Sequence, residues 1–413
     1  MNFTKLCLLG IGIFVFSCNA IEPVELPSDS SDSNELDELI IDTNLKTPEA
    51  QAFVTDNNNF AFDLFRAVAQ DEAKVNYMIS PLSVSMGLGM LSNGAAGETK
   101  TTFEDVIGNG TSTLDMNIYN KLLIDTLTTK SDGTSFNLAN SIWVQEGFPV
   151  QDDFLDVNRI FYNSTVENVN FGSQIAKDKI NSWASENTNG KIDDIADGLS
   201  VNTVMALLNA IYFKSVWKYT FNSNLTREAS FFPYDGDTKK VMMMKMKEDI
   251  HWFSNDQFSS IILPYEEERF EMVLLMPNGN YITSDIINNL SVDFLAQIEE
   301  EGAIYEDLEV YLPRFRTEYD IDLKIALESL GLSIFGSEAD FSNINSSISI
   351  SKIRQKTFIE VNEEGTEAAA AIIGSGVTSA RPRFRGSRPF LYLIKEKYTG
   401  AICFIGHMGD PSI

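Results

Sequence analysis

The fold of this chain is decided by one stretch, which runs from Phe358 to Ala380 and reads FIEVNEEGTEAAAAIIGSGVTSA. Its composition favours a solvent-exposed helix, because alanine is the best helix former and Thr366 can cap the start. The stretch can also be read with a period of two, and one side then carries only small or apolar residues: Thr366, Ala368, Ala370, Ile372, Gly374 and Gly376. Glu367 falls on the other side, so the segment could enter a β-sheet without burying an unpaired charge.

The rest of the chain mixes helical and strand periods. Apolar runs at 204–213 and 270–276 predict interior strands. A charged turn between the apolar segments 390–394 and 401–405 predicts a closing hairpin, in which Cys403 is a small buried hydrophobe. Three segments place apolar residues on one helical face: Phe60, Leu64, Ala67 and Val68; Phe154, Val157, Ile160 and Phe161; and Leu323, Ala326, Leu327 and Leu330. The pattern predicts a mixed α+β fold.

Further motifs occur in one order along the chain. They are Asn76–Ser83 (NYMISPLS), Leu91–Thr99 (LSNGAAGET), Ile180–Trp183 (INSW), Thr188–Ile192 (TNGKI), Leu208–Trp217 (LNAIYFKSVW), Leu312–Phe315 (LPRF), Leu330–Leu332 (LGL), Ala339–Ser342 (ADFS), Arg388–Phe390 (RPF), Phe404–Gly406 (FIG) and Asp410–Pro411 (DP). With the 358–380 stretch, they make the chain similar to the serpin family from about residue 50 to its end. The resemblance implies one domain over residues 50–413, with three β-sheets, about eight or nine helices and an exposed reactive-centre loop at about 364–385.

The resemblance also implies a function, the inhibition of proteases by a suicide-substrate mechanism without enzymatic activity. The loop is cut as bait, its upstream half inserts into the main sheet, and the acylated protease is trapped as a covalent complex. The uncut protein is then metastable and persists for kinetic reasons. The alternative is a serpin-fold protein that no longer inhibits and acts as a binding or surface protein. The small residues of the hinge favour inhibition.

Site residues carry over from the family motif by position. Gly365 is the pivot of the hinge and Thr366 is the first residue to insert, since glycine tolerates the backbone change and short side chains pass between separating strands. Trp217 matches the aromatic residue where the loop first enters. Gln355 stands where many family members have histidine, and its amide does not titrate near neutral pH. The full hinge is Glu363, Glu364, Gly365, Thr366, Glu367, Ala368, Ala369, Ala370 and Ala371, and the polar cluster behind the opening strands is Ser80, Ser83, Asn209 and Gln355.

Two counts place the bait bond. Counting seventeen residues inclusively from Glu363, as in inhibitory family members, places the cut between Ser379 and Ala380. Counting back from the RPF motif favours the bond between Thr378 and Ser379 instead. Either bond follows a small, uncharged residue, which suits an elastase-like, subtilisin-like or papain-like protease. A trypsin-like target is disfavoured because the nearest basic residue, Arg381, precedes a proline.

Composition excludes other classes of function. The formal net charge of -28 repels phosphate backbones, so nucleic acid is not expected as a partner. Only two histidines and three cysteines occur, which leaves few ways to build a metal site or a catalytic dyad, and no GxSxG motif is present. We therefore expect no catalytic residue, metal or cofactor, and a protein that acts as a monomer.

The N-terminal region predicts export. Residues 1–17 carry Lys5 and then a short apolar stretch, and a small residue precedes Cys18, as in a bacterial lipoprotein signal. We expect lipid on Cys18, a disordered acidic tether over 18–49, and anchoring to the bacterial cell envelope at the outer membrane or cell surface. An ordinary signal peptide cut near Ala20 is the alternative.

Overall fold

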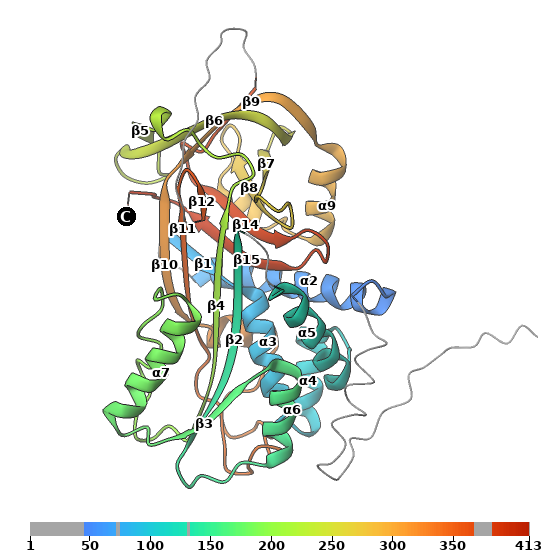
Figure 1. The fold of residues 1–413 in the computed structure, drawn as a ribbon. Helices are drawn as coiled ribbons and strands as arrows, with labels where there is room; N and C mark the ends of the chain where they lie inside the picture. Colours follow the sequence, from blue (N-terminus) through green and yellow to red (C-terminus); the bar gives the residue numbers. More distant parts are fainter. Residues whose placement is uncertain (1–44, 72–74, 130–132, 367–381, 413) are drawn as a thin grey trace, which may run out of the picture. The chain divides into compact units, whose positions relative to one another are not determined.

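The computed structural model describes residues 45–71, 75–129, 133–366 and 382–412. These residues belong to the compact unit Asn44–Ile413 and form nine α-helices and three β-sheets, which confirms the predicted fold class (Figure 1). The first described helix starts at Pro48, close to the predicted domain start at residue 50. The predicted signal peptide, Cys18 and most of the acidic tether lie outside the described residues, as does the loop between 367 and 381.

The helices follow from amphipathic segments with capped ends. The three predicted helical faces lie in α2, α6 and α10, and their apolar residues are largely buried, Leu64 and Leu327 completely. Helix α3 starts where Ser80 caps the Ser83 N–H and Pro81 takes the first position, which has no intrahelical bond to lose. The helices are α2 Pro48–Asp71, α3 Pro81–Ser92, α4 Gly97–Gly108, α5 Thr113–Leu127, α6 Asp152–Tyr162, α7 Gln174–Asn187, α8 Thr283–Ile287, α9 Val292–Glu301 and α10 Lys324–Ser329.

The largest sheet has nine strands in the order β1-β15-β14-β8-β7-β6-β9-β13, with β5 paired to β6. The predicted hairpin is its antiparallel β14–β15 pair, where Cys403 is fully buried, and the predicted strand at 270–276 is β8. The bounds are β1 Asn76–Ile79, β5 Arg227–Phe231, β6 Lys239–Ser254, β7 Phe258–Pro264, β8 Phe270–Pro277, β9 Ala303–Pro313, β13 Arg383–Arg385, β14 Phe390–Glu396 and β15 Ile402–Met408.

The other two sheets place the candidate site between them. Among the described residues, one has four strands, in the order β12-β4-β2-β3, and the other consists of β10 and β11. The strands are β2 Thr134–Gln145, β3 Thr165–Val169, β4 Met205–Val216, β10 Phe315–Asp322, β11 Arg354–Val361 and β12 Gly365–Thr366. Strand β4 contains all but the first residue of the predicted strand at 204–213. In the described residues β4 pairs with β2 and with the two residues of β12, and β11 pairs only with β10. Strands β4 and β11 are therefore the facing edges of these two sheets, and we call the space between them the division between β4 and β11.

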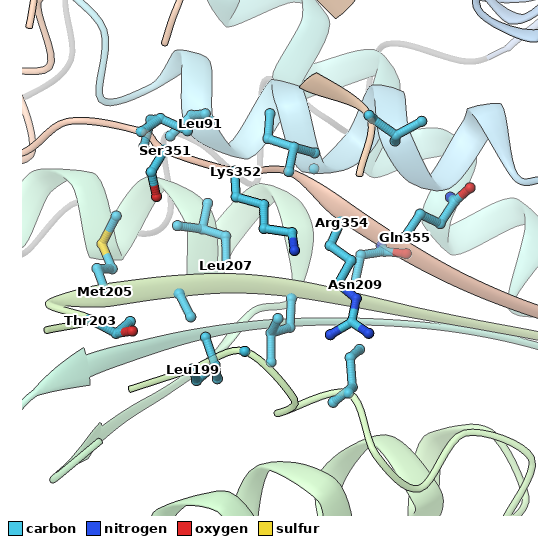
Figure 2. Close-up of a pocket in the computed structure, with 18 of the residues that line it drawn as sticks. Leu91, Leu199, Thr203, Met205, Leu207, Asn209, Ser351, Lys352, Arg354 and Gln355 are labelled. Atoms are coloured by element: carbon cyan, nitrogen blue, oxygen red, sulfur yellow. The ribbon is translucent and has the colours of Figure 1, made fainter. Parts of the chain in front are cut away.

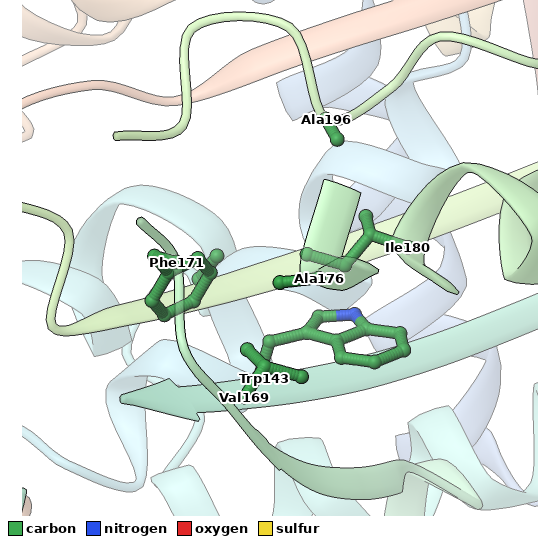
Figure 3. Close-up of a cluster of buried hydrophobic side chains, with 7 residues drawn as sticks. Trp143, Val169, Phe171, Ala176, Ile180 and Ala196 are labelled. Atoms are coloured by element: carbon green, nitrogen blue, oxygen red, sulfur yellow. The ribbon is translucent and has the colours of Figure 1, made fainter. Parts of the chain in front are cut away.

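Helix α7 packs on one face of the four-stranded sheet through a compact apolar cluster (Figure 3). Trp143 of β2 lies at its centre and is 1% exposed, and Ile180 of α7 is completely buried. Ala196, in the segment that follows α7, joins the same cluster, so the cluster fixes both the helix and the segment that leads from it toward β4. The remaining members are Val169, Phe171, Ala176 and Ala206.

Candidate functional site

A cavity of about 420 Å³ lies where the two sheets diverge. Its walls come from both sides of the divided sheet, Met205 to Asn209 of β4 on one side and residues 348–355 leading into β11 on the other (Figure 2). Helix α3 supplies apolar residues, including Leu88 and Leu91, and the segment after α7 completes the lining. The space between β4 and β11 is therefore lined by the edges of two strands that have no common neighbouring strand along this length among the described residues.

Two of the predicted polar residues bond to each other beside this cavity. The Gln355 amide accepts from the Ser80 N–H at 3.0 Å and donates to the Ser80 carbonyl at 2.8 Å. The Ser80 hydroxyl donates to the Cys403 carbonyl at 2.7 Å, which ties the start of α3 to the core strand β15. Because Ser80 is fully buried and Gln355 is 7% exposed, these bonds satisfy groups that water does not reach.

The other two predicted polar residues form a second branch. The Ser83 hydroxyl donates to Asn209 on β4, and the Asn209 amide donates to Asn140 on β2 at 2.6 Å. Asn140 in turn donates to the Tyr162 carbonyl at 2.8 Å, at the end of α6. The two branches meet where the Ser83 N–H donates to the Ser80 hydroxyl at 3.4 Å. The polar cluster therefore connects α3, β2, β4 and β11.

The start of the hinge pairs with the C-terminal end of β4. Thr366 lies opposite Ser215 and Gly365 opposite Val216 in an antiparallel pairing. Gly365 has φ of 155°, and a Cβ there would overlap the Ser215 carbonyl and the Val216 Cα. Glycine is therefore required for this close approach of two backbones.

Trp217 fixes the chain just before this pairing. Its backbone N–H donates to the Glu364 carbonyl at 2.7 Å and its indole N–H to the Asn362 carbonyl at 3.0 Å. The indole is 3% exposed and stacks on Tyr265 with ring centroids 4.5 Å apart. Trp217 thus binds the carbonyls on either side of Glu363 through its backbone N–H and its indole N–H.

Glu363 is a buried carboxylate at the same end. It is 5% exposed and accepts from Arg314 Nε at 2.8 Å, from the second Arg314 nitrogen at 2.6 Å, and from the Thr226 hydroxyl at 2.5 Å. Burial raises the pKa of this carboxyl, but the hydrogen bonds from Arg314 and Thr226 outweigh burial and leave the pKa below its usual value. Glu363 is therefore charged at neutral pH.

The segment after α7 contacts β11 through Asp194 and Asp197, which bind basic side chains of that strand. Arg354 donates to Asp320 of the neighbouring strand β10 at 2.6 Å through Nε and to the Asp197 carbonyl at 2.5 Å. Lys356 of β11 pairs with Asp194. Since Ala196 is held in the Trp143 cluster, this segment bridges the two halves of the divided sheet beside the cavity.

The family model described as "Serpin (serine protease inhibitor)" matches residues 55–411. The chain belongs to the serpin family. It is 31% identical to human Serpin B3 over 384 residues, which cover 86% of this chain and 98% of that protein. Among solved structures, it is similar to the thermophilic serpin tengpin in its native state, with a TM-score of 0.78, 29% identity, and coverage of 87% of this chain and 94% of that one.

The same comparison finds a serpin whose title names a small ligand. A thyroxine-binding globulin in complex with thyroxine matches with a TM-score of 0.78 and 26% identity, over 87% of this chain and 99% of that one. Membership in the serpin family therefore does not by itself distinguish inhibition from ligand binding. The distinction depends on the site of this chain.

Sequence reasoning missed three residues of this serpin's site. Asn140 links Asn209 to α6, while Arg314 and Thr226 bind Glu363. Asn140 lies in a strand without a distinctive motif, and Arg314 was visible only as part of LPRF, so its carboxylate partner could not be read from the sequence. The predicted residues Glu367, Ala368, Ala369, Ala370, Ala371, Thr378, Ser379 and Ala380 lie outside the described residues.

The described part of the chain contains no cluster of three or more His, Cys, Asp or Glu side chains placed to hold a metal ion. None of its helices is long and apolar enough to cross a membrane.

Proposed function

We propose that this serpin inhibits proteases by a suicide-substrate mechanism and does not act as an enzyme. The observation that carries the proposal is the divided sheet: β4 and β11 border a common cavity, and the described hinge residues Gly365 and Thr366 already pair with the end of β4. A strand that continued from Thr366 along β4 would fill this division. Both strand edges would then gain hydrogen-bonding partners.

The chemistry follows from cleavage of the bait bond. The hydroxyl oxygen of the protease's serine attacks the carbonyl carbon of that bond, forms an ester with it, and releases a new amino terminus. The freed upstream segment then inserts beside β4 and carries the ester-linked protease with it. Water must reach the ester to release the protease, so the outcome depends on whether insertion is faster than deacylation.

The bait bond that we propose is Thr378–Ser379 or Ser379–Ala380. Val377 and the small residues that follow it suit a shallow or apolar primary pocket, which favours elastase-like and subtilisin-like serine proteases, with papain-like cysteine proteases as a further class. Sequencing of the released C-terminal fragment by mass spectrometry distinguishes the two bonds by one residue.

Incubation with an elastase tests the proposed function. We expect a band at the sum of the two masses that survives denaturing electrophoresis, together with loss of protease activity at a stoichiometry near one. Cleavage in the loop with full recovery of protease activity would contradict inhibition. It would favour a serpin-fold binding or surface protein, the class to which the thyroxine complex points.

We also propose that the protein is exported and lipid-anchored through Cys18 to the bacterial cell envelope. The support is the order of the N-terminal features, with Lys5, an apolar stretch, a small residue and then the cysteine. Mass spectrometry of the protein made in a bacterium with the lipoprotein pathway should find a diacylated or triacylated Cys18, and Cys18→Ala should abolish the modification. An unmodified N-terminus after Ala20 would contradict the anchor.

A further inference from the structure

Basic side chains gather on the surface where the described chain resumes after the loop. In β13, Phe384 is fully buried and packs edge-on against Trp252, so Arg383 and Arg385 on either side of it are exposed. Strand β13 lies at the end of the nine-stranded sheet and pairs in parallel with β9. The buried phenylalanine thus anchors the strand and holds two arginines on one outer face.

The neighbouring strands β6 and β9 add paired basic and acidic side chains, so this face keeps an excess of positive charge from β13. Arg383 and Lys245 share one carboxylate, Glu309, at 2.9 and 2.7 Å. The Tyr311 ring lies between two cations, with Lys245 Nζ at 5.1 Å and the Arg385 guanidinium at 5.5 Å from its centroid. Arg385 forms no ion pair with another described residue. Two of these cations therefore share one carboxylate, while the third, Arg385, stacks on Tyr311 and has no acidic partner among the described residues.

A fourth cation, Arg388, follows the end of β13 by three residues. Arg388 donates to the carbonyls of Gly279 and Tyr281, both at 2.9 Å, and lies over the Tyr234 ring at 6.0 Å. These partners fix the guanidinium without cancelling its charge. We call the set Lys245, Arg383, Arg385 and Arg388 the basic strip.

We propose that the basic strip docks an acidic surface beside the substrate-binding cleft of the target, so that this serpin selects anionic proteases. The inference rests on the proposed function. Arg383 follows Ala380 by three residues, which span at most about 11 Å of extended chain. A protease that holds either candidate bait bond therefore faces the basic strip at close range.

The basic strip is opposite in sign to the net charge of the whole chain. At -28, the chain repels an anionic protease over long distances. Salt at physiological ionic strength screens exposed charges beyond about 8 Å, so at contact the nearest charges dominate. The basic strip would then orient the protease over the bait bond, while the acidic remainder disfavours other encounters.

A structural role is the competing explanation. Charged residues on an edge strand prevent it from pairing with the edge of another molecule, and β13 is such a strand. Under this explanation, removing both charges would promote self-association, and charge reversal would slow inhibition of every protease to the same degree.

The experiment compares Arg383→Glu/Arg385→Glu with a matched control, Lys100→Glu/Arg159→Glu, which reverses two exposed charges on α4 and α6. The probes are an anionic and a cationic elastase with the same primary specificity. At low ionic strength we expect the double variant to inhibit the anionic enzyme at least about tenfold more slowly and the cationic enzyme no more slowly. Added salt should shrink the difference, and the control should leave the ratio of the two rates unchanged.

A second readout separates this inference from the proposed function. Binding of the anionic elastase with its nucleophilic serine replaced by alanine should weaken in the double variant, whether or not covalent complexes form. Absence of covalent complexes together with arginine-dependent binding would overturn inhibition and retain the basic strip. Equal slowing for both elastases, unchanged binding, or light-scattering evidence that Arg383→Gln/Arg385→Gln self-associates would overturn the basic strip.

Discussion

The two ends of the division between β4 and β11 are built differently. At the C-terminal end of β4 the hinge is already in place, held by the pairing of Gly365 with Val216, by both N–H donors of Trp217, and by the Glu363–Arg314 ion pair. At the other end a cavity of about 420 Å³ replaces the neighbouring strand, beside polar groups that bond to one another. We call the end at Gly365 the closed end and the end at the cavity the open end. An inserting strand would start at the closed end, and the open end has space for it.

The largest effect that we expect comes from Thr366→Arg. This substitution would place a charge on the inserting face of the loop, directly after Gly365 at the closed end. Desolvating an unpaired guanidinium costs several kcal/mol, and slowing insertion by ~3 kcal/mol would favour deacylation about a hundredfold. The variant should be cut at the same bond and release active protease, as measured by the stoichiometry of inhibition. Glu367→Arg, on the opposite face, is the control. Unchanged trapping by both variants would refute the period-two interpretation.

Glu363→Gln tests the closed end. Removing a buried carboxylate that binds Arg314 and Thr226 should lower the free energy of unfolding by about 2 kcal/mol, below the range for fully buried pairs because Arg314 is half exposed. The control is Glu268→Gln, an exposed pair with Lys218, for which we expect no measurable change. Equal effects of the two substitutions in urea denaturation would show that the closed end is not specially stabilised.

The same substitution predicts a pH dependence. Because the pKa of Glu363 is lower in the folded protein than in the unfolded chain, its contribution is complete above the unfolded pKa of about 4.3 and is lost as the pH falls through the folded value. The difference in unfolding free energy between wild type and Glu363→Gln should be constant from pH 7 to pH 5 and shrink below about pH 4. A difference that grew in acid would contradict the assignment.

Gln355→Ala tests the open end with a smaller effect. It leaves the buried Ser80 N–H without its acceptor, which should cost about 1–2 kcal/mol of unfolding free energy. Gln297→Ala on the exposed face of α9 is the control. If thermal unfolding of the intact protein were the same for both variants, the polar cluster would not stabilise the open end.

The smallest effect should come from Asp194→Asn, which removes the exposed partner of Lys356 on β11 and leaves Lys356 its second partner, Asp320. Loss of the Asp194 carboxylate should change the unfolding free energy by less than about 1 kcal/mol. A larger change would show that the segment after α7 restrains the division between the strands.

The sequence predicted the class of fold because its periodic segments and ordered motifs agree. Burial of Leu64, Leu327 and Cys403 follows directly from the apolar patterns in which they lie. The partners within the site were harder to predict, since pairs such as Glu363 with Arg314, or Asn209 with Asn140, join residues far apart in the chain. Hydrogen-bond partners of this kind depend on the register of the assembled sheets, which a single sequence does not contain.

Thermal unfolding before and after a single cut within residues 372–380 is the decisive test of strand insertion between β4 and β11. If the freed segment fills the space between β4 and β11, each inserted residue adds about 0.5–1.5 kcal/mol of net hydrogen bonding, and a dozen residues add on the order of 10 kcal/mol. We therefore expect the cut protein to unfold at a markedly higher temperature than the intact one. An unchanged or lower unfolding temperature would contradict it.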